Sequence, residues 1–342
     1  MTDTFQSSTT ASPLNPRVSK SLGALLGVHA GDSLGATVEF ETHGRIQKQY
    51  PNGVRDIIGG GPFGWPAGHA TDDTDLTRAV LLAYRDRAVA QQGSSTTINF
   101  DVVKSAADWS LKWYKGDWPD RTLGEGPVDI GGATEQGLSK YEDTRDPRYC
   151  GAGFGMAGNG SLMRCIPTAL FAETREERIR DSKAISAFTH NDTRCSISCA
   201  VYNEIVAALV DGKSVLEAVE CGQETAKELN SPMVEEAIST GYRMPISRYA
   251  ATGPGDKLPG RTSGYVLQSL SVAIGALTDP RPLEEVLIDV VRLGGDTDTN
   301  GAIAGGLLGA RDGIEAIPAR WLDKLQFRSD FEEIATSLLS KS

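Results

Sequence analysis

Apolar side chains recur at helical spacing along most of this chain. Leu22, Leu25, Leu26 and Ala30 are separated by intervals of three and four residues, the periodicity of one buried helix face. A strand-like composition is confined to the short segment 54–58, and neither strand–helix–strand alternation nor an internal repeat is present. The pattern predicts an all-α fold, with helices beginning near 21 and 71 and spanning 99–114, 178–188, 194–210, 214–229, 233–243, 263–277, 282–293, 299–310 and 320–339.

Glycine marks both the loops and some of the helices. Three glycine-rich stretches, 51–70, 124–132 and 151–160, interrupt the helical pattern, and unstructured stretches as long as the first are more often functional than idle. Inside helices, small residues lower helix propensity but allow close packing. Close packing is therefore expected for the first helix, through Gly23, Gly27, Gly31 and Gly35, and for the helix near the C-terminus that contains the small-residue run 302–310.

Composition bounds the class of protein. The 342 residues are 39% hydrophobic and 23% charged with a net charge of −11, which fits a globular chain and argues against a general nucleic-acid or membrane-surface binder. No leader is recognisable and no apolar run approaches the ~18 residues of a membrane span, so we expect a cytoplasmic protein. The five cysteines form no CxxC pair, which favours reduced thiols over a zinc site.

The N-terminal residues differ from the rest. Segment 1–19 is rich in Ser and Thr, poor in large apolar side chains and broken by Pro13 and Pro16. Such a composition predicts a disordered tail, and we expect 20–342 to form a single domain. Whether the tail is idle or binds a partner stays open.

Two acidic clusters begin predicted helices far apart in the chain. Asp296 and Asp298 stand among glycines and threonines, and segment 71–75 reads Thr-Asp-Asp-Thr-Asp. Helix capping explains one carboxylate, worth ~0.3–1 kcal/mol, but not two beside several hydroxyls. Oxygen ligands without histidine suit Mg²⁺ or Mn²⁺. We therefore predict that the two clusters meet around metal.

Three alternative readings of these motifs fail. A calcium loop starting at Asp296 requires Glu at its twelfth position, where Leu307 stands. The Gly153–Gly158 segment fits G-x-G-x-x-G, but no buried strand precedes it, as a dinucleotide fold needs. Ser161 lacks the G-x-S-x-G elbow of a serine hydrolase. A glycine loop whose amides hold a phosphate without that fold stays open, and His190 alone is read as a structural histidine.

Several stretches, taken together and in order, resemble the ADP-ribosylglycohydrolases, a family that includes the dinitrogenase reductase-activating glycohydrolase. The resemblance covers residues 21 to about 312 and leaves out the N-terminal tail. The matching stretches are Gly31–Glu39 (GDSLGATVE), Thr71–Thr74 (TDDT), Asp129–Gly131 (DIG), Gly158–Arg164 (GNGSLMR), Thr189–His190 and Gly294–Thr299 (GGDTDT).

The resemblance implies a compact, orthogonal helical fold whose Gly-rich loops form a cleft over two Mg²⁺, or Mn²⁺ in some members. Carried over by position, it implies the metal ligands Thr71, Asp72, Asp73, Asp296, Asp298 and Thr299. It implies a substrate-binding set of Gly158, Asn159, Gly160, Ser161, Met163 and His190. Glu39 matches an acidic residue that closes over the metals, and Asp129 matches a carboxylate near the scissile bond.

The chemistry expected from the resemblance is hydrolysis at an anomeric carbon. Nearby negative charge stabilises an oxocarbenium-like state, and two metals orient ribose hydroxyls and activate water. Asp72, Asp73 and Asp298 are then catalytic through the metals, while Asp129 or Glu39 handles the proton. We expect an ADP-ribosylated protein as substrate. Arginine is the first choice of linkage because the stretches Gly158–Arg164 and Asp129–Gly131 resemble those of the bacterial arginine-type enzymes, and an acidic pocket also suits a guanidinium.

Other functions stay open at this stage. The linkage could instead be ADP-ribosyl-serine, or the substrate a free ADP-ribose derivative. A binding protein that blocks an ADP-ribosylating toxin, as an immunity protein could, is a different class. The complete set of acids favours catalysis over this class and over a non-catalytic, crystallin-like member of the fold.

Overall fold

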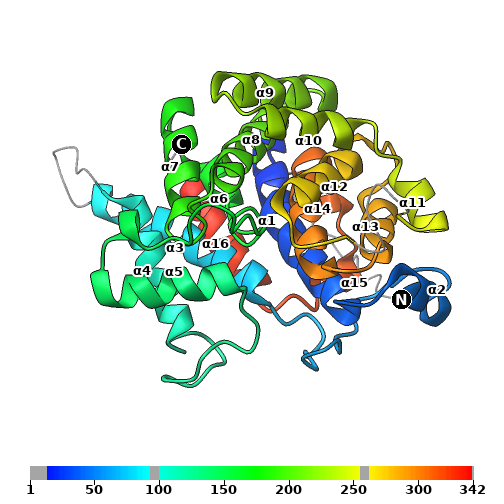
Figure 1. The fold of residues 1–342 in the computed structure, drawn as a ribbon, viewed down its shortest axis with the longest axis horizontal. Helices are drawn as coiled ribbons and strands as arrows, with labels where there is room; N and C mark the ends of the chain where they lie inside the picture. The colour runs from blue at the N-terminus through cyan, green and yellow to red at the C-terminus, as the bar shows by residue number, and fades with distance from the viewer. Residues whose placement is uncertain (1–13, 93–99, 255–261, 341–342) are drawn as a thin grey trace, which may run out of the picture.

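Helices account for the regular structure of the chain. A computed structural model describes residues 14–92, 100–254 and 262–340, and in these residues only isolated β-bridges accompany the helices (Figure 1). The all-α prediction is confirmed. In chain order the elements are α1 (Pro16–Gly35), η1 (Ala36–Val38), α2 (His43–Gln49), α3 (Asp72–Gln92), α4 (Val102–Tyr114), α5 (Gly132–Thr144), η2 (Pro147–Tyr149), α6 (Ile166–Phe171), α7 (Arg175–Ala187), α8 (Thr193–Val210), α9 (Val215–Glu228), α10 (Pro232–Tyr242), α11 (Ile246–Thr252), α12 (Val266–Thr278), α13 (Leu283–Arg292), α14 (Thr297–Asp312), η4 (Ile314–Ala316), α15 (Ala319–Leu322) and α16 (Arg328–Leu339).

The N-terminal boundary differs from the prediction. Helix α1 starts at Pro16 rather than after residue 19, because Asn15 caps it by accepting the backbone N–H of Arg17 at 2.9 Å. Proline is well suited to a first helical turn, where its missing N–H would have had no partner. Residues 1–13 of the expected tail lie outside the described part of the chain.

Other predicted boundaries were wrong near the C-terminus and in short helices. The single helix expected at 320–339 is two, α15 and α16, because the chain turns between them, where Gln326 N–H donates to the carbonyl of Gly68 at 3.0 Å. Helices α2, α5, α6 and α11 were not anticipated. Three of them have only six or seven residues, and α5 buries mostly small side chains such as Ala133 and Gly137, so their apolar periodicity is weak.

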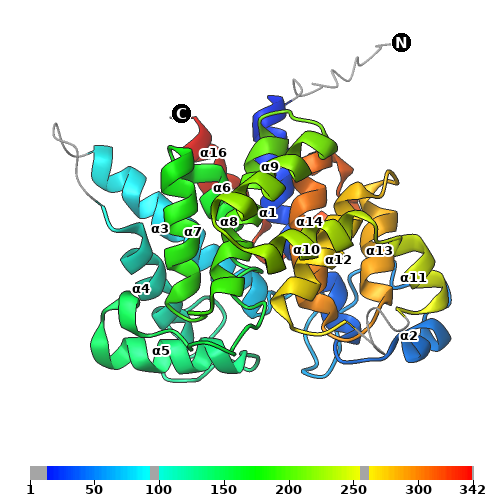
Figure 2. The ribbon, with the colours of Figure 1, turned by 45° about the horizontal axis from the view of Figure 1, so that its top comes forward.

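Helices α1 and α14 form the centre of the molecule, side by side in both views (Figure 1 and Figure 2). They run antiparallel, and glycines every four residues on α1 face α14. A Cβ added to Gly27 would lie 2.2 Å from the carbonyl oxygen of Gly305, and one added to Gly31 would lie 2.0 Å from that of Gly301. The two backbones therefore touch, as the small residues predicted, and this brings the end of α1 to the start of α14.

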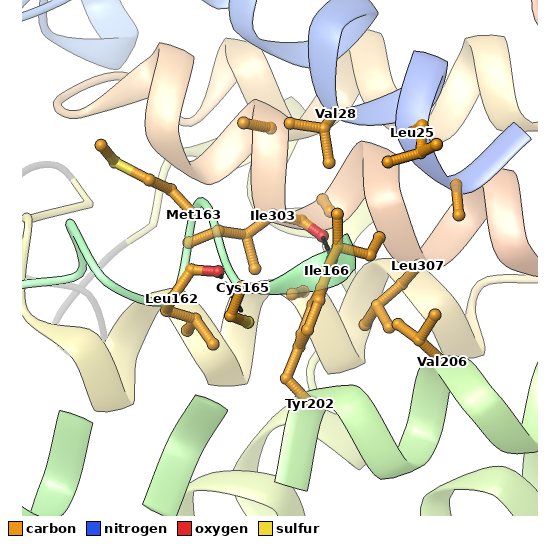
Figure 3. Packing of buried hydrophobic residues seen from close by; sticks show 14 of the residues in the cluster. Leu25, Val28, Leu162, Met163, Cys165, Ile166, Tyr202, Val206, Ile303 and Leu307 are labelled. Atoms are coloured by element: carbon orange, nitrogen blue, oxygen red, sulfur yellow. Dashed lines mark hydrogen bonds between the residues drawn. The ribbon is translucent and has the colours of Figure 1, made fainter. Parts of the chain in front are cut away.

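Apolar side chains pack around this helix pair and hold the segment that follows the third glycine-rich stretch. Figure 3 shows the segment leading into α6 inserted between α1, α14 and α8. The hydroxyl of Tyr202 on α8 donates to the carbonyl of Ile303 on α14 at 2.8 Å. The side chains drawn there include Leu25, Val28, Leu162, Met163, Cys165, Ile166, Tyr202, Val206, Ile303 and Leu307. Among the residues described, no helix has both the length and the hydropathy of a membrane span.

Candidate active site

The two acidic clusters meet at the ends of three helices. Asp32 of α1, Asp73 of α3 and Asp298 of α14 place carboxylate oxygens within 4.8 Å of one another. A second group of the same span joins Glu39, Asp296 and Asp298. Because α1 and α14 run antiparallel in backbone contact, the end of one and the start of the other present their acids at the same point.

Asp32 fixes the start of α3. One carboxylate oxygen, Oδ2, accepts the backbone N–H of Thr71 at 3.1 Å, that of Thr74 at 3.3 Å, and the Thr74 hydroxyl. Helix N-termini carry such unsatisfied N–H groups. The other oxygen, Oδ1, has no hydrogen-bond partner among the residues described. Asp32 belongs to the Gly31–Glu39 stretch but was not among the predicted ligands, because its hydrogen-bond partners lie about forty residues away in the sequence.

The remaining acids differ in their hydrogen-bond partners. Asp73 Oδ2 accepts the hydroxyls of Thr71 at 3.2 Å and of Thr299 at 3.4 Å. Asp298 Oδ1 accepts the backbone N–H of Thr299 at 2.8 Å. Asp72 is only 8% exposed, and its side chain has no hydrogen bond or ion pair with any described residue. All six residues predicted as metal ligands therefore lie in or beside this cluster.

Burial without cationic partners perturbs these carboxyl groups. It raises the pKa of Asp72, Asp73 and Asp298 well above the usual range, with neighbouring carboxylates adding to the effect. Burial also raises the pKa of Asp32 to about 6. Within the described residues, no Lys, Arg or His side chain forms an ion pair with any acid of the cluster. Unpaired buried charge is costly, and the acids must take up protons or hold cations.

The donor atoms fit a hard divalent cation. The oxygens Asp32 Oδ1, Glu39 Oε2 and Asp73 Oδ1 are buried without partners among the described residues. Carboxylate and hydroxyl oxygens, with no sulfur or imidazole in either group, are the ligands of Mg²⁺, Mn²⁺ or Ca²⁺. The calcium-loop geometry is absent, because Thr297 to Asp312 continue as helix α14.

Glu39 and Asp129 stand at the edge of the acidic cluster. Burial, then Asp129 and Asp296, raise the pKa of Glu39 to about 9. Burial and Asp296 raise the pKa of Asp129 to about 6. Glu39 follows η1 directly, and Asp129 lies in the loop before α5. Both side chains line the cleft described next, so both can reach a bound molecule.

A cleft of about 620 Å³ leads away from the acids. Of the residues predicted to bind substrate, five line it, and Ser161 does not: its hydroxyl is buried and accepts that of Ser186 at 2.8 Å. Met163 is 3% exposed and belongs mainly to the core. The predicted site residues along the cleft are Glu39, Asp72, Asp129, Gly158, Asn159, Gly160, Met163, His190, Asp296, Asp298 and Thr299.

Asn159 connects the glycine loop to the acids. Its Nδ2 donates to Asp296 Oδ2 at 2.7 Å and to Ser269 Oγ at 3.0 Å, and its backbone N–H donates to the carbonyl of Gly264 at 2.9 Å. The amide therefore orients Asp296 and sets the distance between loop and cluster. Arg164, fully buried, ties the other side of the loop by donating to the Gly160 carbonyl at 2.6 Å.

His190 packs against the two glycines of the loop. A Cβ on Gly160 would lie 3.0 Å from His190 Cε1, and one on Gly158 would lie 3.4 Å from Nε2. Burial, with the nearby charge of Arg164, lowers the pKa of His190 to about 3, so the ring is neutral. Its Nδ1 is bonded to Thr189 Oγ1 at 2.8 Å. His190 is therefore held in place as a structural histidine and also forms part of the cleft wall.

Two further residues of the cleft were not predicted from the sequence. The guanidinium of Arg194 lies 5.7 Å from the ring centres of Phe154 and of Tyr265. Asp192 pairs with Arg194 at 2.7 Å and accepts the Gly155 N–H at 2.9 Å. Arg194 and Tyr265 line the cleft. No motif could have identified them, because they come from separate segments without distinctive spacing.

Comparisons with known proteins agree over nearly the full length. The family model described as ADP-ribosylglycohydrolase matches residues 13–342. The ADP-ribosyl-[dinitrogen reductase] glycohydrolase of Rhodospirillum rubrum is 30% identical over 317 residues, which cover 92% of each chain. The ADP-ribosylarginine hydrolase Tri1 of Pseudomonas putida (strain GB-1) is 27% identical over 94% of this chain and 78% of its own. A solved structure titled ADP-ribosylglycohydrolase-related protein complex superposes with a TM-score of 0.76 at 29% identity, covering 96% of this chain and 99% of that one.

Proposed function

The chain belongs to the ADP-ribosylglycohydrolase family, and on that premise we propose that it is a divalent-metal-dependent hydrolase of ADP-ribosyl-arginine in proteins. One observation carries the proposal. Buried carboxylates from three helix ends converge without a cationic partner among the described residues, at the base of a cleft bounded by a glycine loop. Such a cluster is costly unless it serves to bind cations.

Two metal ions, Mg²⁺ or Mn²⁺, fit the oxygen donors. We assign them to Thr71, Asp72, Asp73, Asp296, Asp298 and Thr299, whose side chains lie in or beside the cluster. When bound, such ions supply Lewis-acid polarisation of ribose hydroxyls and of water. Asp32 supports this set from behind by holding the N–H groups of Thr71 and Thr74.

The chain's own residues orient the substrate. Gly160 leaves room above the His190 ring, where a Cβ would lie only 3.0 Å from Cε1, and a Cβ on Gly158 would just touch the ring at 3.4 Å. The loop of these glycines can approach a diphosphate closely. Asn159 holds this loop to Asp296. In this arrangement the ADP-ribose lies along the cleft, with its ribose at the acidic end.

Proton transfer falls to Glu39 and Asp129. Both carboxyl groups line the cleft and have raised pKa values, as groups that exchange protons near neutral pH require. One protonates the leaving nitrogen or accepts the proton from the attacking water. The surrounding negative charge stabilises positive charge that develops on the ribose ring.

Arginine is the preferred linkage because the site is acidic. A guanidinium is always charged and gains charge-assisted hydrogen bonds from carboxylates, while a serine hydroxyl gains much less. The relative from Pseudomonas putida is named for ADP-ribosylarginine, which supports the same choice. The R. rubrum relative is named for a modified dinitrogen reductase, consistent with a protein substrate.

The test compares two substrates with and without metal. Peptides carrying ADP-ribosyl-arginine or ADP-ribosyl-serine are incubated with the protein in Mg²⁺ or in a chelator, and released ADP-ribose is measured. We expect turnover of the arginine peptide in Mg²⁺, no turnover of it in the chelator, and no turnover of the serine peptide in either condition. Asp298→Ala should abolish it, while Asp312→Ala, at the other end of α14, should not. Turnover of the serine peptide instead would refute the linkage, and turnover of neither would refute the activity.

A further inference from the structure

A second, smaller cavity adjoins the acidic end of the cleft. We call it the side pocket; it has a volume of about 180 Å³. Asp72 and Asp129 line both the cleft and the side pocket, so these two carboxylates stand where the cavities meet. The remaining lining residues are Trp65, His69, Ala70, Thr71, Asp75, Trp113, Asp120, Arg121, Glu125, Gly126, Pro127 and Val128.

We propose that the side pocket binds the leaving group of the reaction, the guanidinium end of the modified arginine. This inference rests on the proposed function. With ADP-ribose along the cleft, the anomeric carbon lies near Asp72 and Asp129, and the bond to be cleaved points from the cleft into the side pocket. The two products then separate into different cavities.

The size of the pocket suits one side chain. Pockets for drug-sized ligands measure ~300–1,000 Å³, so about 180 Å³ is too small for a nucleotide and large enough for part of an amino-acid side chain. The pocket is bordered by the loop 120–129, which precedes α5. Of this loop, the sequence predicted the glycine-rich stretch 124–132 and a functional role for Asp129 alone.

The carboxylates that line the side pocket favour a positively charged ligand. Besides Asp72, which is assigned above to the metal ions, four carboxylates line the side pocket against one guanidinium, that of Arg121. The nitrogens of Arg121 already donate to the carbonyls of Trp113 and Glu125 at 2.7 Å each. Asp75 is 7% exposed, and its two oxygens accept the indole N–H groups of Trp113 and Trp118, both at 2.7 Å. Each carboxylate oxygen has a further lone pair, so Asp75 is held rigidly and can still accept a hydrogen bond.

An aromatic wall completes the pocket. Trp65 lies against His69 with ring centres 4.9 Å apart and planes at 17°. Tryptophan attracts guanidinium groups through its ring face. Its Nε1–H is buried and has no acceptor among the described residues, so the indole would bind a guanidinium through its ring and not through a hydrogen bond. A serine leaving group would use neither the acids nor the ring.

The experiment measures product inhibition with matched probes. L-arginine and L-citrulline have nearly the same shape, but citrulline carries no charge. We expect L-arginine to inhibit hydrolysis of an ADP-ribosyl-arginine peptide at concentrations at least tenfold below those needed for citrulline. Trp65→Leu should weaken this inhibition about tenfold, which corresponds to ~1.4 kcal/mol and lies within the range of cation–π contacts. Asp75→Asn should act in the same direction.

The control is Trp109→Leu, which removes a tryptophan of α4 that lines neither cavity. It should leave arginine inhibition unchanged, and all variants should bind ADP-ribose as the wild type does. Equal inhibition by citrulline and arginine, or no effect of Trp65→Leu, would overturn the side pocket while leaving the activity intact. If Asp75→Asn does not fold, Trp65→Leu decides. If no turnover is found, the proposed function fails, and calorimetry with L-arginine and citrulline tests the pocket alone.

Discussion

Replacing Gly31 by alanine tests the packing that brings the acids together. A Cβ at this position would lie 2.0 Å from the carbonyl oxygen and 2.3 Å from the carbonyl carbon of Gly301. Ordinary contacts begin at 3.4 Å, so the shortfall to the oxygen is about 1.4 Å. Neither obstacle is a side chain that can rotate away, and helices α1 and α14 must separate or shift.

The energetic cost follows from two opposed effects. Overpacking a buried contact costs ~1–3 kcal/mol and occasionally more, while alanine in place of glycine favours a helix by ~0.8–1 kcal/mol. Because the clash is with backbone, we expect the upper part of the first range, and a net loss of about 2 kcal/mol in the free energy of unfolding. The shift also displaces Asp32 relative to Asp298, so metal affinity should fall at least tenfold.

Urea denaturation and metal titration measure the two effects. Gly23→Ala is the matched variant: its Cβ would lie 2.4 Å from the Gly309 carbonyl oxygen, at the end of the same helix pair that is remote from the acids. It should lose stability but keep metal affinity. Gly44→Ala meets nothing within 4 Å and should gain slightly. A Gly31→Ala protein as stable as Gly44→Ala would refute the packing argument.

Three further results are expected. Burial lowers the pKa of His29 to about 4, so below pH 6.5 the unfolded chain takes up a proton that the folded chain does not. The free energy of unfolding should therefore fall by about 1.6 kcal/mol between pH 6.5 and 5 through this group, and urea titrations of His29→Gln should lack that part. Mg²⁺ should raise the melting temperature more at pH 8 than at pH 6, because protons compete with the metal for Asp72, Asp73 and Asp298, whose pKa values burial raises well above the usual range. An equal shift at both pH values would contradict this. In Arg164→Lys, the ammonium group cannot donate to both the Gly160 carbonyl and Thr189 Oγ1 as the guanidinium does. Calorimetry should therefore find that ADP-ribose binds about tenfold more weakly, and unchanged affinity would show that the loop needs no such anchor.

The sequence predicted what depends on local pattern. Apolar periodicity predicted the long helices, and the paired acids at 71–75 and 296–298 predicted an oxygen-rich cluster, because each is a short-range regularity. The matching of glycines across α1 and α14 could not be predicted, since Gly27 and Gly305 reveal their pairing only once the helices are antiparallel. The glycines themselves indicated close packing without indicating the partner.

Residues that act through distant partners escaped prediction. Asp32 is one acid in a stretch of small residues, and its role depends on N–H groups of α3. The side pocket joins Trp65, Asp75 and Glu125, which no spacing connects. Ser161 was carried over with its motif, yet its hydroxyl lies in the core beside Ser186, because the side chain after Gly160 points inward. A linear motif shows which residues are near one another, but not which way they face.

Anomalous X-ray scattering from crystals grown with Mn²⁺ and ADP-ribose tests the central claim most directly. The account predicts two manganese peaks among the carboxylates of Asp72, Asp73, Asp296 and Asp298, with the ribose beside them and the diphosphate along the Gly158–Gly160 loop. Asp298→Ala crystals should lose at least one peak. Manganese bound elsewhere, or ADP-ribose bound away from these acids, would contradict it.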